Sequence, residues 1–490
     1  MWPSPSSAWM RLWARPVGRG VAALLLCSLL ACTTVIYGRQ PAPTPAPASA
    51  PAPTVPPPAP PAARPTSRAP TASAPPAERP PLLIEGLPRV PVVMRDGEQI
   101  VRVALLTEAA SASISATGTW RWYEADGRSF VARGLANEPW RVEHNGRDVR
   151  AVRSDGVPTV WKPGAMVARP DDPSALMIVN GKHYHGEIRV VGSDNGMLVI
   201  DRVDVEEYLR GVVPLEIGDR APGDSAAVEA QAVTARSYVF THMSDAAGDV
   251  YDVTAGVLDQ VYGGVDAETR VGDDAVEATR GMVITYGGRV VNAPYHSTCG
   301  GETARPSEVW HAPDEPYLQR VSDRIPGTDR YYCDIAPRFT WTRTLSAGDL
   351  NAAVLRYLKA YVAVPGGNPG LVRSVRVTGR TPSGRVGTLG VETTRGSYTL
   401  RGNDMRFVLR APGGEILNST YFSVASEPTR DGMLVRLVLD GRGYGHGVGM
   451  CQWGAIGRAR AGQDFQTILR TYYPGTALAV AEQGRAERAQ

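Results

Sequence analysis

Between residues 88 and 200, hydrophobic and polar residues alternate in short runs. Alternation of this kind has the two-residue period of a strand that buries one face. Turn-forming pairs such as Asp96-Gly97 and Asn145-Gly146 separate the runs. The pattern predicts a β-rich N-terminal part with strands at residues 89–93, 100–106, 120–123, 142–144, 188–191 and 197–203.

A helical period replaces the alternation after residue 223. Asp224 is a candidate N-cap, and small or apolar residues recur from Ala226 to Phe240 at the spacing of one helix face, which predicts a helix over 224–243. The same reasoning predicts helices at 267–280, 347–359, 403–410 and 448–460, and strands at 282–286, 289–293, 371–378, 388–393 and 432–439. Helices and strands follow one another without strict β-α-β alternation, so the predicted fold class is α+β.

The N-terminal region has a different composition. Seventeen of the 41 prolines lie between Pro41 and Pro81, and no acidic residue precedes Glu78. A segment of this kind cannot bury enough apolar surface to fold. We therefore predict a disordered Pro/Ala-rich linker at 33–87, the β-rich part at 88–200, a mixed α+β core at 201–476 and a flexible polar tail at 477–490.

The first 32 residues carry the marks of a secretory signal. Arginines at 11, 15 and 19 precede an apolar run from Val21 to Leu30. The ending Leu29-Leu30-Ala31-Cys32 resembles a bacterial lipobox, which predicts a lipoprotein signal peptide at 1–32 and lipidation of Cys32. Thr33 favours an outer-membrane anchor facing the periplasm. A cleaved signal without lipid and an uncleaved anchor are the alternatives.

The net charge of the whole chain is +3, and its positive sign comes from arginines near the N-terminus. Six arginines precede Glu78, which leaves 46 basic against 49 acidic residues in the rest of the chain. Without an excess of basic residues, a nucleic-acid partner is not expected. No apolar run of roughly 18 residues follows Tyr37, so the only membrane contact we expect is the lipid anchor.

Glu216 is the first candidate for chemistry. It lies in the apolar run 212–217, directly before a turn. Apolar neighbours can desolvate a carboxyl group and raise its pKa, as general acid catalysis requires. The alternative is a structural glutamate paired with Arg210 or Arg236.

Glycines occupy every second position from Gly441 to Gly449. Such a run lets the backbone approach another group closely. It does not fit a phosphate-binding loop, because no Gly-Lys-Ser/Thr follows and no β-α-β unit surrounds it.

Six segments together resemble the SpoIID/LytB family of bacterial cell-wall proteins over about residues 100–475. In the family's order they are EYLRGVVPLE at 207–216, AQAVTARSY at 230–238, QVYG at 260–263, HSTCGG at 296–301, PYL at 316–318 and GHGVGMCQWGA at 445–455.

The resemblance implies that 201–476 is a SpoIID-like catalytic core acting on peptidoglycan. Lytic members of the family cleave the MurNAc-GlcNAc bond with one glutamate, at the position of Glu216, and prefer strands stripped of their stem peptides. The C6 hydroxyl of the sugar is the nucleophile, so a 1,6-anhydro end forms and the second carboxylate of most glycosidases is not needed. The alternative function, also implied by the resemblance, is a non-catalytic enhancer of an N-acetylmuramoyl-L-alanine amidase.

The resemblance also suggests which residues bind the glycan. They are Gln231, Arg236, Tyr238, Gln260, Tyr262, Tyr444, His446, Gln452 and Trp453. Of these, Tyr262, Tyr444 and Trp453, together with Trp310, are candidates to stack on sugar faces, and core packing is the alternative for each. A plain structural role is the alternative for His446.

Three cysteines remain beyond Cys27 and Cys32 of the signal. A disulfide uses two of them, whereas a zinc ion can take all three with an imidazole. Some family members carry zinc-binding cysteines and histidines in this region, so the resemblance favours a structural zinc, not required for catalysis, at His296, Cys299, Cys333 and Cys451. A Cys299–Cys333 disulfide is the first alternative. A zinc peptidase or amidase built around His296 is the second, and a closed four-ligand shell disfavours it.

Overall fold

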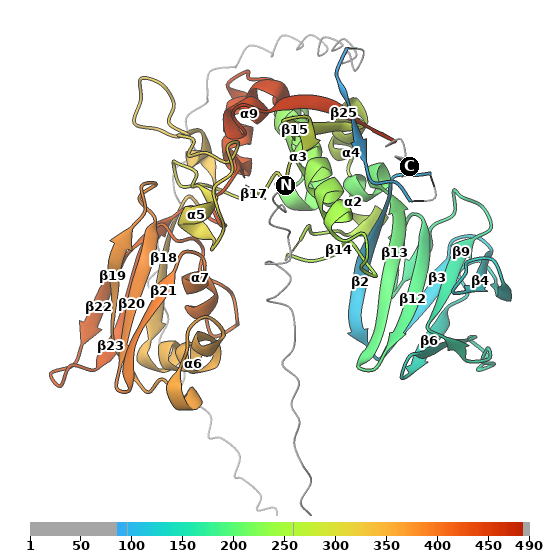
Figure 1. Cartoon of the computed structure of the whole chain (residues 1–490), viewed down its shortest axis with the longest axis horizontal. Helices are drawn as coiled ribbons and strands as arrows, with labels where there is room; N and C mark the ends of the chain where they lie inside the picture. Colours follow the sequence, from blue (N-terminus) through green and yellow to red (C-terminus); the bar gives the residue numbers. More distant parts are fainter. Residues whose placement is uncertain (1–85, 96, 258, 484–490) are drawn as a thin grey trace, which may run out of the picture. The chain divides into compact units, whose positions relative to one another are not determined.

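The computed structural model describes residues 86–95, 97–257 and 259–483 (Figure 1). These residues form a mixed α+β fold, as the sequence predicts. The predicted signal peptide, the lipidation site Cys32 and the linker up to residue 85 lie outside them. Within the described ranges, no helix combines the length and the apolar character needed to cross a bilayer.

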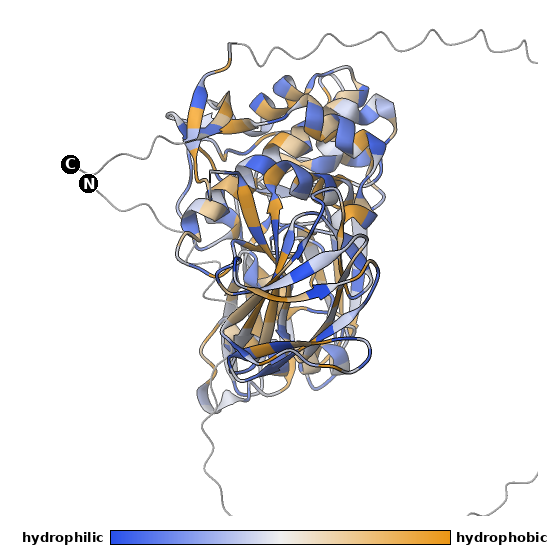
Figure 2. Ribbon diagram, turned by 90° about the vertical axis from the view of Figure 1, so that its right-hand side faces the viewer, coloured by the Kyte–Doolittle hydropathy of each residue, from blue (hydrophilic) through white to orange (hydrophobic). Residues whose placement is uncertain are grey.

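Two sheets make up the β-rich part. The first has the order β14 (Val253–Thr254), β2 (Ile100–Ala109), β13 (Gly196–Asp204), β12 (Glu187–Ser193), β9 (Ala165–Pro170), β4 (Trp120–Glu124) and β5 (Phe130–Gly134). The second has the order β11 (Lys182–Tyr184), β10 (Met177–Val179), β3 (Ser111–Ala116), β6 (Trp140–Asn145), β7 (Asp148–Val152) and β8 (Lys162–Pro163). Hydrophilic and hydrophobic residues alternate along these ribbons (Figure 2).

The β-rich part shares its core with the helices that follow. Buried Trp120, Trp122 and Trp140 pack edge to face and belong to one hydrophobic cluster that extends to Ala481. The short strand β14 lies beyond the predicted boundary at residue 200 and adds in parallel to β2. Residues 88–200 therefore do not form a core of their own.

The helices of the shared core surround α3 (Ser225–Asp245), which contacts α2 (Val205–Ile217), α4 (Arg270–Ala278), α8 (Gln452–Arg460) and α9 (Phe465–Tyr472). Most of the side chains of α3 are buried, because small residues such as Ala230 and Ala235 let neighbouring elements approach on several sides. The short helix α5 (Pro306–Val309) lies in the segment that leads to the next part of the chain. In that segment, β17 (Tyr295–His296) pairs in parallel with β24 (Met450–Cys451), which comes later in the sequence.

The C-terminal segment corrects one prediction. A further sheet has the order β1 (Arg89–Val92), β25 (Ala477–Gln483), β15 (Met282–Tyr286) and β16 (Arg289–Val290). Strand β25 pairs in parallel with β1 and antiparallel with β15, so residues 477–483 are an inner strand and not part of a flexible tail. The apolar residues Leu478 and Val480 give this segment strand character despite the polar sequence after it.

Residues 340–442, here named the inserted module, have a second hydrophobic core that runs from Leu345 to Leu439. The predicted core at 201–476 is therefore divided in two. Two three-stranded sheets form the module, β18 (Thr340–Ser346), β23 (Leu434–Arg442) and β22 (Phe422–Pro428), and β19 (Val372–Arg380), β20 (Val386–Thr393) and β21 (Gly396–Arg401). They are accompanied by the helices α6 (Ala347–Tyr357) and α7 (Asp404–Val408).

The chain leaves and rejoins the shared core at one place. Cys333 precedes the module and Cys451 follows it. Beside them, the backbone N–H of Gly443 donates to the carbonyl oxygen of Phe339 at 2.8 Å, so the outgoing and returning segments are hydrogen-bonded to each other.

Candidate active site

Helix α2 carries Glu216 at its C-terminal end. The helix begins after Asp204, whose side chain accepts a hydrogen bond from the N–H of Glu206 at 2.8 Å. It ends at Gly218, which has a φ of 83° and follows Pro214 in the last turn. The partial negative charge at a helix C-terminus disfavours a carboxylate there, so the position of Glu216 itself favours the protonated acid.

The surroundings of the Glu216 carboxyl group act in the same direction. The pKa of Glu216 is raised because burial disfavours its charged form, and hydrogen bonds from the Val261 N–H, Tyr295 and Gln452 offset only part of that effect. The Val261 N–H lies 2.7 Å from Oε1. Within the described part of the chain, Glu216 forms no ion pair, since Arg236 pairs with Glu206 and Arg210 with other carboxylates. The Glu216 side chain is half-buried, and a partly desolvated carboxyl group with only neutral partners has the properties of a general acid.

Neutral side chains continue the hydrogen-bond network around Glu216. Gln260 donates from Nε2 to the Tyr295 hydroxyl at 3.1 Å and accepts at Oε1 from the Tyr208 hydroxyl, also at 3.1 Å. On another side, Gln452 Nε2 donates to Gln231 Oε1 at 3.2 Å. The structure thus brings the predicted glycan-binding residues Gln231, Gln260 and Gln452 to the candidate acid, and their contact with a glycan stays a prediction.

Sequence reasoning missed Tyr295. It stands directly before the HSTCGG segment, and β17 turns its hydroxyl toward Glu216 and Gln260. The predicted residue Tyr238 packs edge-on against the Tyr295 ring, with centroids 6.5 Å apart, and donates to Asp259 Oδ1 at 3.4 Å. The adjacency of Tyr295 to a recognised motif was the only sequence signal for it.

Trp453 is the predicted aromatic residue nearest to this network along the chain. It follows Gln452 on α8, is half-buried, and has the Arg220 guanidinium 4.8 Å above its ring. Arg220 itself lies four residues after Glu216 and donates from Nε to the carbonyl oxygen of Ile217 at 2.7 Å. Arg220 thus links the Trp453 ring to the end of α2, and stacking of Trp453 on a sugar stays a prediction.

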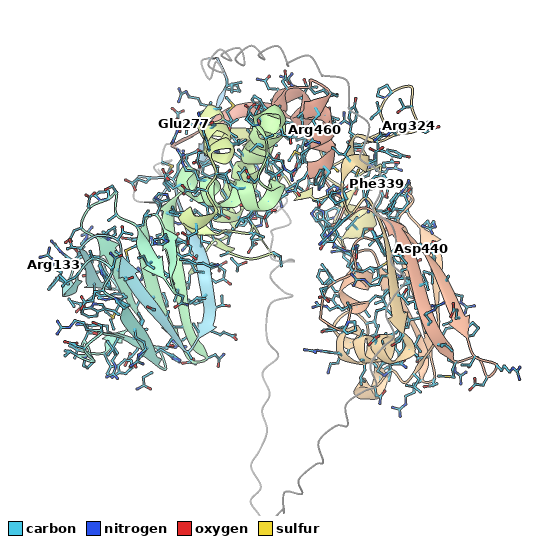
Figure 3. The ribbon with its side chains drawn as sticks, turned by 180° about the vertical axis from the view of Figure 1, so that it is seen from behind. Arg133, Glu277, Arg324, Phe339, Asp440 and Arg460 are labelled. Carbon is cyan, nitrogen blue, oxygen red and sulfur yellow. The ribbon has the colours of Figure 1, made fainter. Side chains whose placement is uncertain are left out.

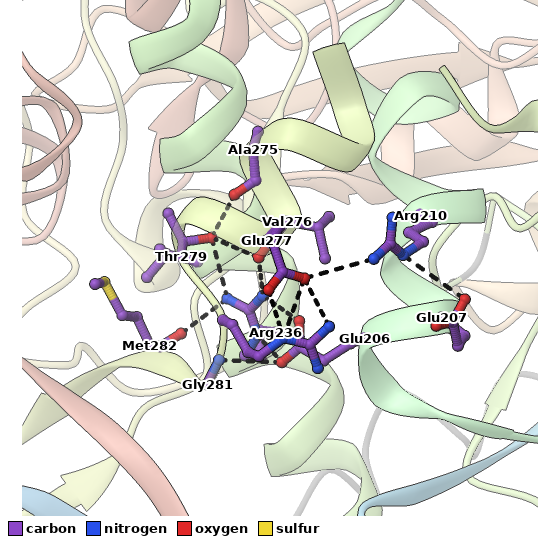
Figure 4. Close-up of polar contacts among 12 residues, drawn as sticks. Glu206, Glu207, Arg210, Arg236, Ala275, Val276, Glu277, Thr279, Gly281 and Met282 are labelled. Carbon is purple, nitrogen blue, oxygen red and sulfur yellow. Dashed lines mark hydrogen bonds and ion pairs between the residues drawn. The ribbon is translucent and has the colours of Figure 1, made fainter. Parts of the chain in front are cut away.

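Arg236 makes its hydrogen bonds within the core. Its guanidinium donates to both carboxylate oxygens of Glu206, at 2.9 and 2.6 Å, and to the carbonyl oxygen of Met282 at 3.1 Å (Figure 4). The side chain is 0% exposed. Arg236 is therefore held in a buried ion pair, and the structure gives its predicted glycan contact no support.

Tyr262 is also a core residue. Its hydroxyl donates to Asp201 at 2.9 Å, and its ring packs against Tyr208 with centroids 4.9 Å apart. A Cβ at Gly211 would lie 2.7 Å from the Tyr262 ring, so glycine is needed there for the ring to pack on α2. Tyr444 packs with Arg338, whose guanidinium lies 4.9 Å from its ring centroid. Tyr262 therefore packs in the core, which was the alternative to sugar stacking. Among the residues described, Tyr444 neither bonds to nor packs against the side chains of the Glu216 network.

His446 supports Tyr295 from the opposite side. Its Nδ1 accepts from the Val448 N–H at 3.1 Å, so Nε2 carries the proton and donates to the carbonyl oxygen of Tyr295 at 2.7 Å. Burial, followed by the charge of Arg406, lowers the pKa of His446 to about 3, which keeps the ring neutral. The Trp310 ring packs on it with centroids 4.9 Å apart. These contacts favour a structural role for His446, which was the alternative to glycan binding.

A second cluster joins Cys299, Cys333 and Cys451 with Asp323. Their ligand atoms all lie within 4.8 Å of one another, and all four residues are buried. The three thiols are free, and the Sγ atoms of Cys299 and Cys333 are 3.4 Å apart. His296, the predicted fourth ligand, is not among the residues whose ligand atoms come together, and its Nδ1 is bonded to the carbonyl oxygen of Val448 at 3.1 Å. The fold supplies Asp323 in its place.

The cluster has the donor set and the hydrogen bonds of a zinc-type site. Cys451 Sγ accepts from the N–H groups of Cys299 and Gly454 at 3.2 and 3.3 Å, and such bonds stabilise thiolates. Hydrogen bonds from the neighbouring thiols lower the pKa of Cys333 to about 3, and burial raises the pKa of Asp323 to about 7. Three sulfurs and a carboxylate oxygen fit a borderline-soft divalent cation.

Asp323 is held in place by partners outside the thiols. Its Oδ1 accepts from the Tyr472 hydroxyl at 2.6 Å and from Arg458 at 3.0 Å, while Oδ2 lies 3.5 Å from the Cys299 sulfur. Arg385 of the inserted module donates to the carbonyl oxygen of Cys299 at 2.7 Å. Side chains from several segments therefore converge where the module joins the shared core.

Two family models match the chain. One, described as Stage II sporulation protein, covers residues 193–286, which include Glu216 and Gln260. The other, described as a domain of unknown function (DUF8618), covers residues 329–449 and contains the inserted module.

Similar proteins extend these matches. An uncharacterized protein of Brachyspira hyodysenteriae is 28% identical over 379 residues, 77% of this chain and 92% of that protein. Stage II sporulation protein D of Bacillus subtilis is 30% identical over 300 residues, 58% of this chain and 76% of that protein. The amidase enhancer of Bacillus subtilis is 30% identical over 310 residues, and this chain spans 40% of its length.

The matched segment contains the helix that bears Glu216, and it places the protein in the class described as Stage II sporulation proteins. With the similarity to sporulation protein D and to the amidase enhancer, the chain belongs to the SpoIID/LytB family.

Proposed function

We propose that this protein is a peptidoglycan lytic transglycosylase in which Glu216 serves as both acid and base. The observation that carries the proposal is the Glu216 carboxyl group, which is half-buried at a helix C-terminus, has a raised pKa and has only neutral hydrogen-bond partners. Family membership supports a cell-wall glycan as the substrate.

The reaction needs one proton that moves out and back. Protonated Glu216 donates to the glycosidic oxygen between MurNAc and GlcNAc as the bond from C1 to that oxygen breaks. The Glu216 carboxylate then takes the proton of the C6 hydroxyl while O6 bonds to C1, which gives a 1,6-anhydro end. The nucleophile belongs to the substrate, so no second carboxylate is required, in contrast to most glycosidases.

The neutral hydrogen-bond network allows Glu216 to be both protonated and ionised during the proposed reaction. Tyr295 and Gln452 bond to the carboxyl group and can stabilise the carboxylate that remains after proton donation, without a fixed positive charge that would keep it ionised beforehand. Trp453 supports binding, because its ring, which Arg220 links to the end of α2, can stack on a sugar.

Replacing Glu216 tests the proposal. Glu216→Gln keeps the shape of the side chain and removes its titration, and Glu207→Gln is the matched control on the same helix. We expect the first variant to form no anhydro ends from peptide-stripped glycan, measured by mass spectrometry, and the control to form them. Equal amounts of anhydro ends from Glu216→Gln and from the native protein would refute the proposal that Glu216 is the catalytic residue.

A non-catalytic amidase enhancer is the second candidate, favoured by the relative that bears this name. It predicts no soluble product at any protein concentration, together with faster amidase turnover when both proteins are mixed. Either function places the protein in the cell envelope, and we propose a periplasmic location with a lipid anchor at Cys32 in the outer membrane.

We also propose a structural zinc held by Cys299, Cys333, Cys451 and Asp323. With four protein ligands the ion would have no open position for water, so it would cross-link the segments at the base of the module and take no part in catalysis. One zinc per chain that is lost in Cys451→Ser supports this assignment. An intact mass lacking two hydrogens, with no metal, would support the disulfide instead.

A further inference from the structure

The inserted module has a groove of its own. A cavity of about 840 Å³ is lined by β18, β22 and β23 and by the turn before β20. Its lining includes no residue of the Glu216 network. Asp440, labelled in Figure 3, lies on its wall and accepts a hydrogen bond from Thr342 at 2.6 Å. This volume is in the range of sites that hold small molecules or a few sugar units, roughly 300–1,000 Å³.

Two aromatic rings line this groove. Trp341 is the cross-strand partner of Gly441, and a Cβ at Gly441 would lie 2.3 Å from the indole. Glycine therefore allows the ring to lie directly on the backbone of β23. The indole N–H is buried and has no hydrogen-bond partner among the residues described, so the ring and not its N–H faces the groove. The second ring, Tyr421, is covered by the Arg442 guanidinium 4.1 Å from its centroid. Aromatic faces beside hydrogen-bond donors are suited to sugar rings.

Two arginines of the groove lack acidic partners. Arg380 donates to the carbonyl oxygens of Gly384 and Phe422, each at 2.9 Å, and Arg442 donates to the Tyr421 hydroxyl. No carboxylate in the described ranges forms an ion pair with either of them.

Other arginines of the same strands differ. Arg376 on β19 pairs with Glu392, and Arg436 on β23 pairs with Glu427. The groove thus holds two guanidinium groups fixed by neutral oxygens and one carboxylate, Asp440, which forms no ion pair with either of them. Its lining keeps a net positive charge, which favours an anion.

We infer that the groove binds an acidic saccharide strand, with a sugar ring against Trp341 and carboxylates at Arg380 and Arg442. The identity of the strand rests on the proposed function. In a peptide-stripped glycan each muramic acid has a free lactyl carboxylate, whereas a stem peptide converts that group to an amide. The module would thus hold the same strand that Glu216 cuts, at a separate place.

The test measures binding in the full-length Glu216→Gln protein, which does not consume the ligand. The probes are soluble peptide-free glycan strands, the same strands with stem peptides, and neutral chitin oligomers. Arg380→Glu reverses one charge in the groove. Arg373→Glu is the matched control, because Arg373 is exposed on the same strand and does not line the cavity. Arg380→Gln removes the charge without reversing it, and thermal unfolding verifies that each variant is folded.

We expect Arg380→Glu to weaken the binding of peptide-free glycan by about tenfold or more, the loss expected for one charge-assisted contact. Arg380→Gln should show a smaller loss, and Arg373→Glu should bind as the parent does. Neutral chitin oligomers should bind equally to all variants.

Three results would overturn the inference: unchanged binding in Arg380→Glu, an equal loss in Arg373→Glu, or an equal loss for glycan and chitin. Loss of amidase stimulation with unchanged glycan binding would also overturn it and identify a protein-binding groove. The outcome is separable from the enzyme proposal, because anhydro products from Glu216→Gln would refute the mechanism and leave the binding data intact.

Discussion

Helix α2 carries two glutamates with opposite surroundings, one buried and one half-buried. Near its start, Glu206 is 4% exposed and accepts two hydrogen bonds from Arg236 and a third from the Gly281 N–H (Figure 4). Near its end, Glu216 meets only the Val261 N–H, Tyr295 and Gln452. One helix thus contains a glutamate paired with a guanidinium and a glutamate that has no cationic partner.

The difference separates a structural role from a chemical one. A buried charge must be paired, and the Glu206–Arg236 pair joins α2 to α3 and to the segment before β15. A carboxyl group without a cation can keep its proton until a substrate oxygen takes it. The burial of a glutamate does not by itself reveal its role, whereas the charge of its partners does.

The largest expected effect is on catalysis. Glu216→Gln should lower the rate of anhydro-end formation by about 10³-fold, because the general acid is lost, and should leave the free energy of unfolding unchanged within about 1 kcal/mol. Initial rates and urea unfolding of the same preparation measure both. Glu206→Gln should show the reverse, with lower stability and normal activity in the folded fraction. A rate loss in both variants would remove the distinction between them.

The next effect is on stability. Arg236→Met should reduce the free energy of unfolding by about 3–5 kcal/mol, since it leaves the Glu206 carboxylate buried and unpaired. The double variant Glu206→Gln/Arg236→Met should recover part of that loss, measured by the same denaturant unfolding. Native stability combined with weaker glycan binding in Arg236→Met would restore its predicted substrate role.

Metal removal acts on the base of the inserted module. A strong chelator, or Cys333→Ser, should lower the melting temperature of a zinc-loaded protein by several degrees and expose residues near 333 and 451 to proteolysis. Cys27→Ser is the control, because Cys27 lies in the predicted signal peptide. An unchanged melting curve and cleavage pattern after complete removal of metal would contradict a structural zinc.

The pH dependence is the smallest expected effect and concerns Glu216 alone. The reaction needs protonated Glu216, so kcat/KM should fall as the pH rises through its raised pKa. Tyr295→Phe removes a hydrogen bond that lowers this pKa, so its falling limb should lie at higher pH. A limb at lower pH in Tyr295→Phe would show that the hydroxyl does not stabilise the carboxylate.

The stability of the native protein should follow the same group. A raised folded-state pKa means that the folded protein binds the proton more tightly than the unfolded chain does. The contribution is therefore complete below the ordinary glutamate pKa and is lost as the pH rises to the raised value. Glu216→Gln should lack this loss and be at least as stable as the native protein at alkaline pH.

The sequence predicts most of the fold where local pattern decides. Alternation placed β2 and β13, and the helical period placed α3 within two residues of its ends. It failed for β25, whose pairing with β1 joins the two ends of the described chain. It also failed to separate the inserted module, because the boundary between two hydrophobic cores depends on tertiary contacts and not on periodicity.

For the site, too, local motifs were predicted from the sequence, and residues brought together by tertiary contacts were not. The family motifs identified Glu216 and the glutamines of its network, but they could not distinguish Arg236 as an ion-pair partner from Arg236 as a ligand contact. Asp323 was missed because an isolated acidic residue 24 positions from Cys299 has no pattern. His296 was chosen for its closeness in sequence to Cys299, yet its ring is bonded to the Val448 carbonyl.

Cys333 and Cys451 lie on either side of the inserted module, and their sulfur atoms are within 4.8 Å of each other. The intervening residues could consequently be lengthened, exchanged or bridged by a brief linker without stretching the polypeptide around Glu216. Such an arrangement would allow the proposed binding site of the module to change in evolution without a change in the proposed catalytic site.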